Sequence, residues 1–430
     1  MPHLAMIASA TQNPLGRRAP ISNLLAPSTP GLTGTCSLNR LPVAEVSPNK
    51  SGGLYMPRAA FIYEDALSRH ALRSDHPMRP VRLRYTYELL REYGAFDHAD
   101  AVLLDPRSAT EDELAWLHTS EYIAAVKALG SGEGSVDGAR FGFSGQGDNP
   151  VYPNMFEAAA LSTGGSLLAA EIVASGEVRA AFNISGGLHH AAAGHASGFC
   201  VFNDPALAVH YFLNKGMRVA YVDIDAHHGD GVQEAFYSDA RVLTISVHES
   251  GQYLFPGTGF VSEVGMGAGR GYSVNLPLYP YTGDDDYLEA FGQVVPPLIR
   301  AFAPDVLVTQ LGIDSYHSDP LTHLQVTTAG YIEAVRQLAG LGLPWLALGG
   351  GGYDVDAVAR AWTLAYGVML DIDWPDQLPA GFAQEHGAGS LRDQLSPEVP
   401  SHIKTDIRRH IEDTVGEIRQ QIFPVHGLGG

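Results

Sequence analysis

Short apolar runs alternate with segments of helical periodicity along most of the chain, beginning near residue 60. The runs have the length and the β-branched or aromatic content of buried strands, and we predict strands at 60–63, 101–104, 180–184, 218–223, 242–246, 272–276, 305–310 and 345–348. Helical patterns lie between most of them, at 81–93, 111–129, 154–175, 205–215, 287–302, 328–341 and 355–369. This alternation predicts an α/β fold, with a mostly parallel sheet and helices on both of its faces. Ligands of such sheets bind beyond the carboxyl ends of the strands, which is where the polar motifs of this chain lie.

The strand predicted at 218–223 runs directly into a dense set of ionisable residues. The apolar residues 219–222 are followed by Asp223, Asp225, His227, His228 and Asp230. Burying unpaired charges at the end of a strand is costly, and a bound metal ion would remove that cost. In an extended chain, residues two apart share a face, so Asp223, Asp225 and His227 can converge on one point. We therefore expect a metal site at this strand end.

A third candidate ligand, Asp314, follows the strand predicted at 305–310. Together with Asp225 and His227 it gives two carboxylates and one imidazole, and three protein ligands with an open position are typical of a catalytic zinc site. Two carboxylates make this set harder than three histidines, which leaves Fe²⁺ as an alternative metal. A single aspartate after a strand is also common as a helix N-cap or turn residue, so the assignment of Asp314 depends on the other motifs.

Two adjacent histidines, His189 and His190, follow a Gly-Gly pair after the strand predicted at 180–184. Asp223 and Asp230 remain free once the metal ligands are assigned, so two Asp–His pairs can form. A carboxylate that accepts an imidazole N–H fixes the tautomer and raises the basicity of the ring, and one such pair can act as a general base toward water. The alternative for Asp230 is to cap a helix that begins near Gly231.

The strand predicted at 345–348 is followed by four glycines, 349–352, and by Tyr353. Glycines let the backbone approach a site closely, and a phenol placed there can stabilise the oxyanion of amide hydrolysis. A flexible loop with a packed tyrosine is the structural alternative. A phosphate cradle is disfavoured because neither a following Lys-Ser/Thr nor GxGxxG spacing is present.

Two further loops, 198–204 and 254–259, each present an aromatic residue, Phe199 and Phe255. If they face each other, these rings form a narrow apolar channel suited to a methylene chain such as that of lysine, although each alone is more often a core residue. Asp148 lies in a Gly-Asp-Asn-Pro segment before a predicted helix. It is a candidate for binding substrate amides at the channel rim or, alternatively, for a helix cap.

Composition narrows the class of protein. The 430-residue chain has a formal net charge of −20, which disfavours direct binding of nucleic acid because that requires a basic surface. Its two cysteines, Cys36 and Cys200, give no disulfide framework, so we expect a reducing cytoplasm. No apolar run approaches the ~20 residues of a membrane span, so we expect no membrane association.

The two ends of the chain differ from its middle. Residues 1–55 are rich in Pro, Ser, Thr, Gly and Asn, so we predict a disordered extension there, and Met56 is a candidate for the natural start. Near the carboxyl end, apolar residues recur three and four positions apart, which predicts one stripe on a helix: Ile403, Ile407, Ile411, Val415, Ile418 and Ile422. This stripe either packs on the parent domain or forms a homo-oligomer contact.

Taken in order, the motifs GGLHHA, SGFCVFND, DIDAHHGDGV, FPGTG, QLGIDS and GGGGY resemble those of the zinc-dependent histone deacetylase family. The segments HPMRPVRL and GDNP point to the branch shared by class I deacetylases and bacterial acetoin-utilisation deacetylase-like proteins. The similarity covers about residues 59–375, so we expect a catalytic domain at 56–375 and a carboxyl-terminal segment at 376–430. It implies the three-layer arginase–deacetylase fold around an eight-stranded parallel sheet.

The resemblance also implies roles for individual residues. It assigns zinc to Asp225, His227 and Asp314, general acid–base catalysis to His190, electrostatic support to His189, and polarisation of the amide carbonyl to Tyr353. Asp223 and Asp230 would be the respective carboxylate partners of His190 and His189. The acyl-lysine channel and its surroundings would comprise Gly198, Phe199, Phe255, Gly351, Asp148 and Leu321, with Arg82 beneath the site near an acetate exit path. Two structural K⁺ ions would be bound, one by Asp223, Asp225, His227, Ser246 and Val247 and the other by Phe236, Asp239, Val242 and Tyr272.

The implied reaction removes an acetyl or other short acyl group from lysine side chains of proteins, with a zinc-activated water as nucleophile. Acetylpolyamines or other small acylated amines are the alternative substrates. An arginase-like ureohydrolase would need an Asp-x-His-x-Asp run, and here Asp230 comes one residue too late. A module without catalysis is disfavoured because every expected catalytic residue is present. The segments 191–197 and 315–318 depart from the class I pattern, which leaves the acyl-chain and peptide preference open.

Overall fold

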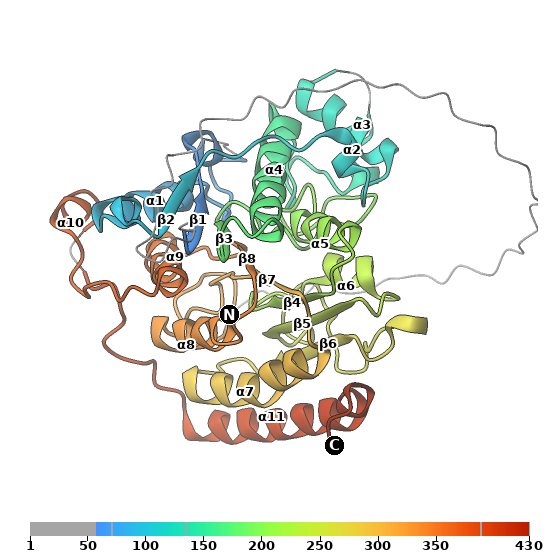
Figure 1. The fold of residues 1–430 in the computed structure, drawn as a ribbon, viewed down its shortest axis with the longest axis vertical. Coiled ribbons are helices and arrows are strands. Elements are labelled where there is room, and N and C mark those ends of the chain that lie inside the picture. The colour runs from blue at the N-terminus through green and yellow to red at the C-terminus, as the bar shows by residue number, and fades with distance from the viewer. Residues whose placement is uncertain (1–56, 70–71, 134–135, 388, 430) are drawn as a thin grey trace, which may run out of the picture. The chain divides into compact units, whose positions relative to one another are not determined.

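The structure of the protein, a computed structural model, describes residues 57–69, 72–133, 136–387 and 389–429 (Figure 1). The extension predicted at 1–55 and the candidate start at Met56 lie outside the described residues. The same holds for Cys36.

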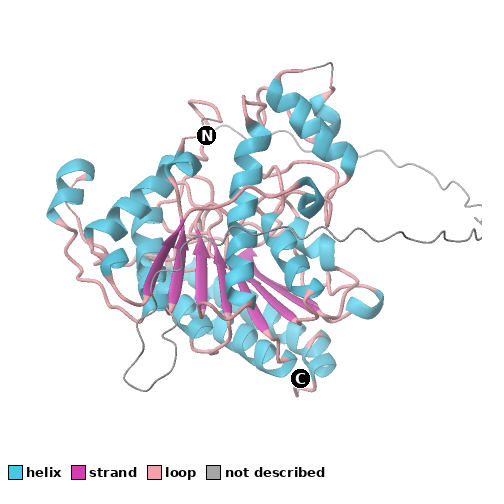
Figure 2. Ribbon diagram, turned by 45° about the horizontal axis from the view of Figure 1, so that its top comes forward, coloured by secondary structure: helices cyan, strands magenta, loops and turns pink. Residues whose placement is uncertain are grey.

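An eight-stranded sheet forms the centre of the described fold. Its strands are β1 (Ala59–Ile62), β2 (Ala101–Leu104), β3 (Ala180–Asn183), β4 (Val219–Asp223), β5 (Val242–Glu249), β6 (Ser273–Leu278), β7 (Val306–Gln310) and β8 (Trp345–Leu348). They lie in the order β2-β1-β3-β8-β7-β4-β5-β6, and every neighbouring pair is parallel. In Figure 2 all the arrowheads accordingly point to the same edge. The predicted parallel α/β sheet is confirmed.

Only β5 extends well beyond its predicted range. It continues past Ser246 to His248 and Glu249, which pair with Pro277 and Leu278 of β6. Both polar side chains are buried. In the sequence, the polar residues His248 and Glu249 suggested that the strand had ended. In the structure, hydrogen bonding to β6 extends β5 through both residues.

Helices cover both faces of the sheet, as Figure 1 shows. On one face lie α4 (Met155–Ala174), α5 (Asp204–Asn214) and α6 (Asp230–Phe236), and on the other lie α1 (Val81–Glu92), α7 (Asp284–Phe302), α8 (Thr328–Ala339) and α9 (Val355–Leu370). Alternate residues of each strand enter opposite cores: Ala220 and Val222 enter one, and Val219 and Tyr221 the other. This two-sided burial explains why the strands read as continuous apolar runs.

The helix predicted at 111–129 is two helices, α2 (Glu111–Leu114) and α3 (Ser120–Ser131). Each begins with its own threonine cap. Thr110 and Glu113 form a capping box, and Thr119 Oγ1 accepts from the N–H of Tyr122 at 3.2 Å. Capping side chains satisfy the free N–H groups of a first turn. The second cap, Thr119, therefore starts a second helix, whereas the apolar periodicity alone predicted a single continuous helix.

Helix α4 corrects one expectation, namely that no segment has the length and apolar character of a membrane span. This 20-residue helix is long and apolar enough by length and composition, but 72% of its most apolar window is buried inside the protein. Its apolar side chains contact both the sheet and the neighbouring α3 and α5. The apolar character of α4 therefore reflects its place in the core.

Buried His118, which lies between α2 and α3, predicts a loss of stability in mild acid. Burial lowers the pKa of His118 from 6.5 to about 4, so between these values the unfolded chain binds a proton that the folded protein does not. Stability present above pH 6.5 is therefore lost as the pH falls, by about 2 kcal/mol from His118 between pH 7 and pH 5. Urea unfolding at both pH values measures this loss, and His118→Gln, which keeps an acceptor for the N–H of Asn203, is expected to reduce it. An equal loss in the variant would contradict the assignment.

The carboxyl-terminal segment contains α10 (Ala380–His386) and α11 (Ser401–Gln421). Helix α11 packs on α7 and β6, with Ile407, Ile411 and Ile418 buried and Ile403 only partly so. His410 of α11 lies with its Nε2 3.0 Å from the backbone oxygen of Pro277 in β6. The apolar stripe is thus covered by the chain's own domain.

Shortening a buried side chain of this stripe is expected to destabilise the whole domain. Ile418 is fully buried, and Ile→Ala at such a position typically costs about 2–5 kcal/mol. Urea unfolding of Ile418→Ala measures the loss, with the half-buried Ile403→Ala as the smaller-effect control. If α11 were loosely attached, both variants would unfold like the parent protein.

Candidate metal centre and catalytic site

The four strand ends that carry the polar motifs are neighbours in the sheet. The loops that follow β3, β8, β7 and β4 contain, respectively, the histidine pair, Tyr353, Asp314, and Asp225 with His227. The chain crosses from β3 over two strands to β4 at this place, and such switch points open a crevice at the carboxyl edge of a sheet. Residues far apart in the sequence therefore meet at one site.

Asp225, His227 and Asp314 form a buried group whose ligand atoms all lie within 4.8 Å of one another. His227 Nδ1 is 3.1 Å from Asp225 Oδ1 and 2.9 Å from Asp314 Oδ2. Burial and the carboxylate of Asp225 raise the pKa of Asp314 to about 7, because two buried carboxylates lie close together there. Two carboxylates and one imidazole at this spacing fit a divalent cation such as zinc.

Backbone and amide groups fix the two carboxylates. Asp225 Oδ2 accepts from the N–H of Gly351 at 2.7 Å and from Gln310 Nε2 at 2.6 Å, and Asp314 Oδ1 accepts from the N–H of Ala226 at 2.7 Å. A Cβ atom on Gly351 would lie only 2.0 Å from Asp314 Oδ2, so the glycine loop after β8 must approach the carboxylates without a side chain. Gly351, expected beside the substrate, thus lies against the carboxylates of Asp225 and Asp314.

The histidine pair is held by two aspartates from different elements. His189 Nδ1 lies 2.7 Å from Asp223 Oδ2, and His190 Nδ1 lies 2.7 Å from Asp230 Oδ1. This reverses the expected pairing of Asp223 with His190: Asp223 ends β4 directly below His189, whereas Asp230 begins α6, beside His190. The two Nε2 atoms lie 3.0 Å apart.

The environments of the two rings move their pKa values in opposite directions. Burial opposes protonation of His189, but the carboxylates of Asp223 and Asp225 outweigh it and raise the pKa to about 9. Burial and the neighbouring charge of His189 lower the pKa of His190 to about 4. Near neutral pH, His190 is therefore the neutral ring of the pair and His189 the protonated one.

Aromatic rings lie on two sides of this group. The Phe255 ring is 5.1 Å from that of His190 and 6.4 Å from that of His227, while the Phe199 ring is 5.7 Å from that of Tyr353. Phe255 is 43% exposed, so it reaches from the buried site to the surface. Asp148 is exposed, and its backbone oxygen lies 3.0 Å from Nε2 of His76, which packs on Phe199. Phe199 and Phe255 thus flank the predicted metal centre.

Residues 76–369 match the family model of the histone deacetylase domain. The chain belongs to the histone deacetylase family. The acetoin utilization protein AcuC of Bacillus subtilis (strain 168) is 45% identical over 332 residues, covering 75% of this chain and 85% of that protein. Histone deacetylase 1 of Homo sapiens is 36% identical over 369 residues, covering 85% of this chain and 74% of that protein.

Solved structures of family members are similar to this deacetylase-family chain over most of its length. An HDAC homolog complexed with SAHA has a TM-score of 0.76 at 30% identity, covering 84% of this chain and 99% of that one. An HDAC homolog from Aquifex aeolicus has a TM-score of 0.75 at 31% identity with the same coverage. Together the matches confirm the resemblance to the class I and AcuC branch and the arginase–deacetylase fold.

Arg82 of this histone deacetylase family member lies beneath the glycine loop. Its guanidinium donates to the backbone oxygens of Gly350 at 2.7 Å and Gly352 at 2.9 Å. Burial lowers its pKa. A cavity of about 100 Å³ lies beside it, with Ser185, Leu188 and Phe199 among its lining residues. The position agrees with the expected place of Arg82 below the site.

The residues expected to bind potassium lie in two groups along β5. Asp223 and Ser246 are paired across β4 and β5, with Val247 next in the strand. In the second group, Phe236 and Asp239 each accept a backbone hydrogen bond, and the Asp239 carboxylate pairs with Arg241. Tyr272 likewise accepts from the N–H of Thr244, and Val242 begins β5. The assignment to K⁺ stays a prediction.

Gln310 and Asp319 are buried residues that hold the site and were not identified from the sequence. Besides its bond to Asp225, Gln310 accepts through Oε1 from the N–H of Gly312 at 2.7 Å. Asp319 accepts from the N–H of Tyr353 at 2.8 Å and from the N–H of Leu321 at 2.9 Å. An amide side chain at the end of a buried strand was the available signal for Gln310. Asp319 has no comparable local signal.

His228, to which the sequence assigns no role, fastens the loop that carries Phe255. Its Nδ1 lies 2.9 Å from Thr258 Oγ1, and its ring lies 4.9 Å from that of His248. His228 is buried and is not part of the Asp225–His227–Asp314 group. We therefore do not count it among the ligands.

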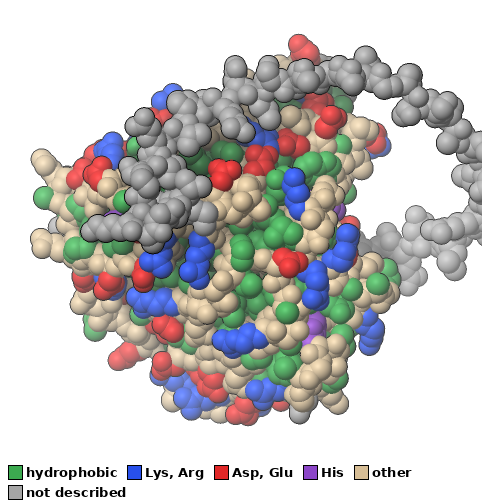
Figure 3. All heavy atoms as spheres, in the orientation of Figure 1, with side chains coloured by type: hydrophobic (Ala, Val, Ile, Leu, Met, Phe, Trp, Pro, Cys, Tyr) green, Lys and Arg blue, Asp and Glu red, His purple; other side chains and the backbone are tan. Residues whose placement is uncertain are grey.

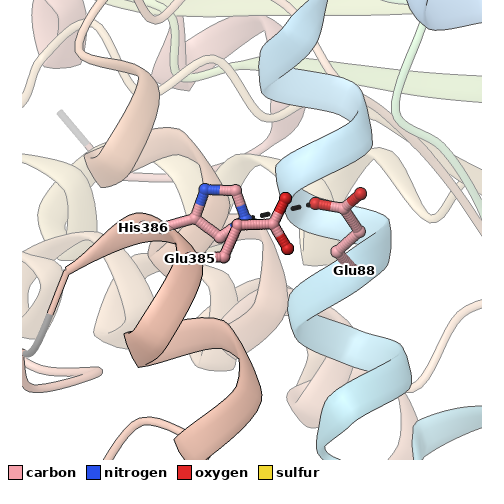
Figure 4. Close-up of side chains that lie close together, drawn as sticks. All are labelled: Glu88, Glu385 and His386. Atoms are coloured by element: carbon pink, nitrogen blue, oxygen red, sulfur yellow. Dashed lines mark hydrogen bonds and ion pairs between the residues drawn. The ribbon is translucent and has the colours of Figure 1, made fainter.

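A second group of potential metal ligands lies between α1 and α10, formed by Glu88, Glu385 and His386 (Figure 4). His386 Nε2 is 3.2 Å from Glu88 Oε2, and Glu88 also pairs with Arg84 at 3.4 Å. The imidazole packs on Tyr85, with ring centroids 4.1 Å apart. Because Arg84 already balances Glu88, this group is best explained as fastening α10 to α1.

Proposed function

We propose that the chain is a zinc-dependent deacylase that hydrolyses the amide of acylated lysine side chains in proteins. The observation that carries the proposal is the arrangement of the buried Asp225–His227–Asp314 group beside the histidine pair, with Phe199 and Phe255 on its flanks. Such rings suit the methylene chain of a lysine. Fe²⁺ is the alternative metal, and K⁺ is proposed as a structural ion.

Zinc held by Asp225, His227 and Asp314 would supply a Lewis acid that polarises the amide carbonyl and lowers the pKa of water. His190, neutral near pH 7, accepts the proton of the attacking water through Nε2 while Asp230 holds its Nδ1. His189, paired with Asp223, places positive charge beside the reacting centre. His190 then returns the proton to the departing amine. Acetate and a free amine are the products.

Tyr353 is proposed to donate its phenolic proton in a hydrogen bond to the oxyanion. Burial raises its pKa well above 10, helped by the charges of Asp314 and Asp225. The phenol therefore stays protonated and available as a donor. The bond from the Tyr353 N–H to Asp319 keeps the backbone of this residue in place.

The proposed partners are acylated proteins in the cytoplasm, without direct contact to nucleic acid or membrane. On the face drawn in Figure 3, lysine and arginine side chains are scattered among aspartate, glutamate and uncharged residues, and the visible part shows no continuous basic surface. Nucleic-acid binding relies on such a surface.

The test compares kcat/KM for acetyl-lysine peptides, longer acyl-lysine peptides and acetylpolyamines, using the zinc-loaded full chain. We expect the highest values for short-chain acyl-lysine peptides. A strong preference for acetylpolyamines would replace the proposed substrate with a small acylated amine. Absence of turnover on the whole panel would overturn the proposed hydrolase activity.

A further inference from the structure

The loop that carries His189 and His190 has little regular structure of its own. Its backbone hydrogen bonds within residues 183–192 are short-range turns, from Gly186 to Asn183 and from His189 to Gly187. Yet both rings are almost fully buried and point at separate aspartates. An external support must therefore fix this backbone.

The support is a dipeptide at the start of α5. Asp204 accepts from the N–H of Gly187 at 3.0 Å through Oδ2 and from the N–H of Leu188 at 2.9 Å through Oδ1. Asn203 donates through Nδ2 to the backbone oxygens of His189 at 3.2 Å and Ala191 at 2.9 Å. The two adjacent side chains thus bind four backbone groups of the histidine loop. Asp204 accepts from two N–H groups that precede the histidine pair, and Asn203 donates to two carbonyl groups, one within the pair and one after it.

Both side chains are completely buried and closely surrounded. A Cβ atom on Gly186 would lie 2.4 Å from Asp204 Oδ2, and one on Gly231 would lie 2.7 Å from Asn203 Nδ2. Gly231 follows Asp230, the carboxylate that holds His190. Asn203 therefore lies between the histidine loop and the first turn of α6, the two segments that carry His190 and Asp230.

We propose that Asn203 and Asp204 are positioning residues that align the His189–His190 pair for proton transfer. Capping of α5 does not account for these contacts. Asn203 caps the helix through Oδ1, which accepts from the N–H of Ala206 at 2.9 Å, while its Nδ2 serves the histidine loop. The Asp204 carboxylate accepts hydrogen bonds from N–H groups of that loop and from the hydroxyl of Ser166 at 2.5 Å.

The inference rests on the proposed function, and isosteric variants test it. Asn203→Asp keeps the helix cap but loses the donor to the two carbonyls, and Asp204→Asn keeps the volume but turns one acceptor into a donor facing N–H groups. Each is expected to lower kcat about 10- to 100-fold because misplaced catalytic groups lose that much rate, with KM within about threefold. Asn203→Ser, which also keeps a capping oxygen, is the second variant if either fails to fold.

A matched control is Asp284→Asn, since Asp284 also accepts two hydrogen bonds, from the N–H and hydroxyl of Thr327 at 2.7 and 2.6 Å, but between α7 and α8. It is expected to lower the unfolding midpoint without changing kcat. If the Asn203 and Asp204 variants lose stability as Asp284→Asn does while keeping kcat, their role is structural and the proposal is wrong.

A readout without substrate separates this proposal from the proposed function. Nitrogen-15 NMR of the imidazoles reports the Nδ1 hydrogen bonds of His189 and His190 in the zinc-loaded protein. Both signals are expected to shift in Asp204→Asn and Asn203→Asp and to stay in place in Asp284→Asn. Unshifted signals would overturn the positioning role even if the enzyme is active, whereas shifted signals in a protein that hydrolyses no panel substrate would overturn only the proposed function.

Discussion

Replacing Asp314 by alanine is expected to abolish zinc binding and, with it, hydrolysis. Asp314 is one of the three proposed ligands, and its Oδ2 lies only 2.9 Å from His227 Nδ1. Its loss leaves two protein ligands, which do not hold a catalytic zinc ion. The variant also loses the acceptor of the Ala226 N–H, so Asp225 and His227 lose part of their support as well. Elemental analysis after chelation and reloading with zinc measures the effect.

The matched control for Asp314→Ala is Glu385→Ala in the surface group near α10. We expect this variant to keep one zinc ion per chain and full activity, because that group serves only to fasten the helix. Stoichiometric zinc in Asp314→Ala would refute the ligand assignment. Loss of zinc in Glu385→Ala would show that the metal measured is bound at the surface.

Replacing His190 by alanine is expected to lower kcat/KM about 10²- to 10⁴-fold, the usual contribution of a general base, while zinc stays bound. Its ring is the neutral member of a pair whose pKa values are driven apart to about 4 and about 9, and such separation supports the proposed roles of base and charged partner. Tyr353→Phe is expected to lower kcat about 10²- to 10³-fold through loss of the oxyanion donor. Steady-state kinetics with an acetyl-lysine peptide provides both values.

The exposed His402→Ala at the start of α11 is the control for the histidine substitution, and its kinetics should match the parent chain. Zinc content must be measured in each variant, because loss of metal would mimic loss of the base. Retention of at least a tenth of the parent kcat/KM in zinc-loaded His190→Ala would remove His190 from the proposed mechanism.

The sheet and the candidate metal ligands can be predicted from the sequence because both are marked by short local patterns. A buried parallel strand reads as an apolar run, and polar residues just beyond it stand at one edge of the sheet. This reasoning places Asp225, His227, Asp314 and Tyr353 at adjacent strand ends. It does not decide which aspartate meets which histidine, because that depends on the relative position of β4 and α6 around the His189–His190 loop.

The residues that were missed support the site from a distance in the sequence. Gln310 bonds to Asp225 and Asp319 to Tyr353, and neither contact follows from periodicity or motif spacing. The single helix expected at 111–129 was wrong for a different reason. Apolar periodicity continues across a break that only the caps Thr110 and Thr119 reveal.

Strand β6 is at the edge of the sheet: among the described residues its one partner strand is β5. Unpaired strand edges invite pairing with other chains and hence aggregation. Pro277 has no N–H to offer there, and His410 of α11 contacts its carbonyl. Helix α11 therefore shields a surface that would otherwise be open to intermolecular β-pairing. A chain shortened at residue 375 would keep Asp225, His227 and Asp314 but would lack α11 and so expose β6. Poor solubility of such a fragment would then be caused by the exposed strand edge and not by damage to the candidate site.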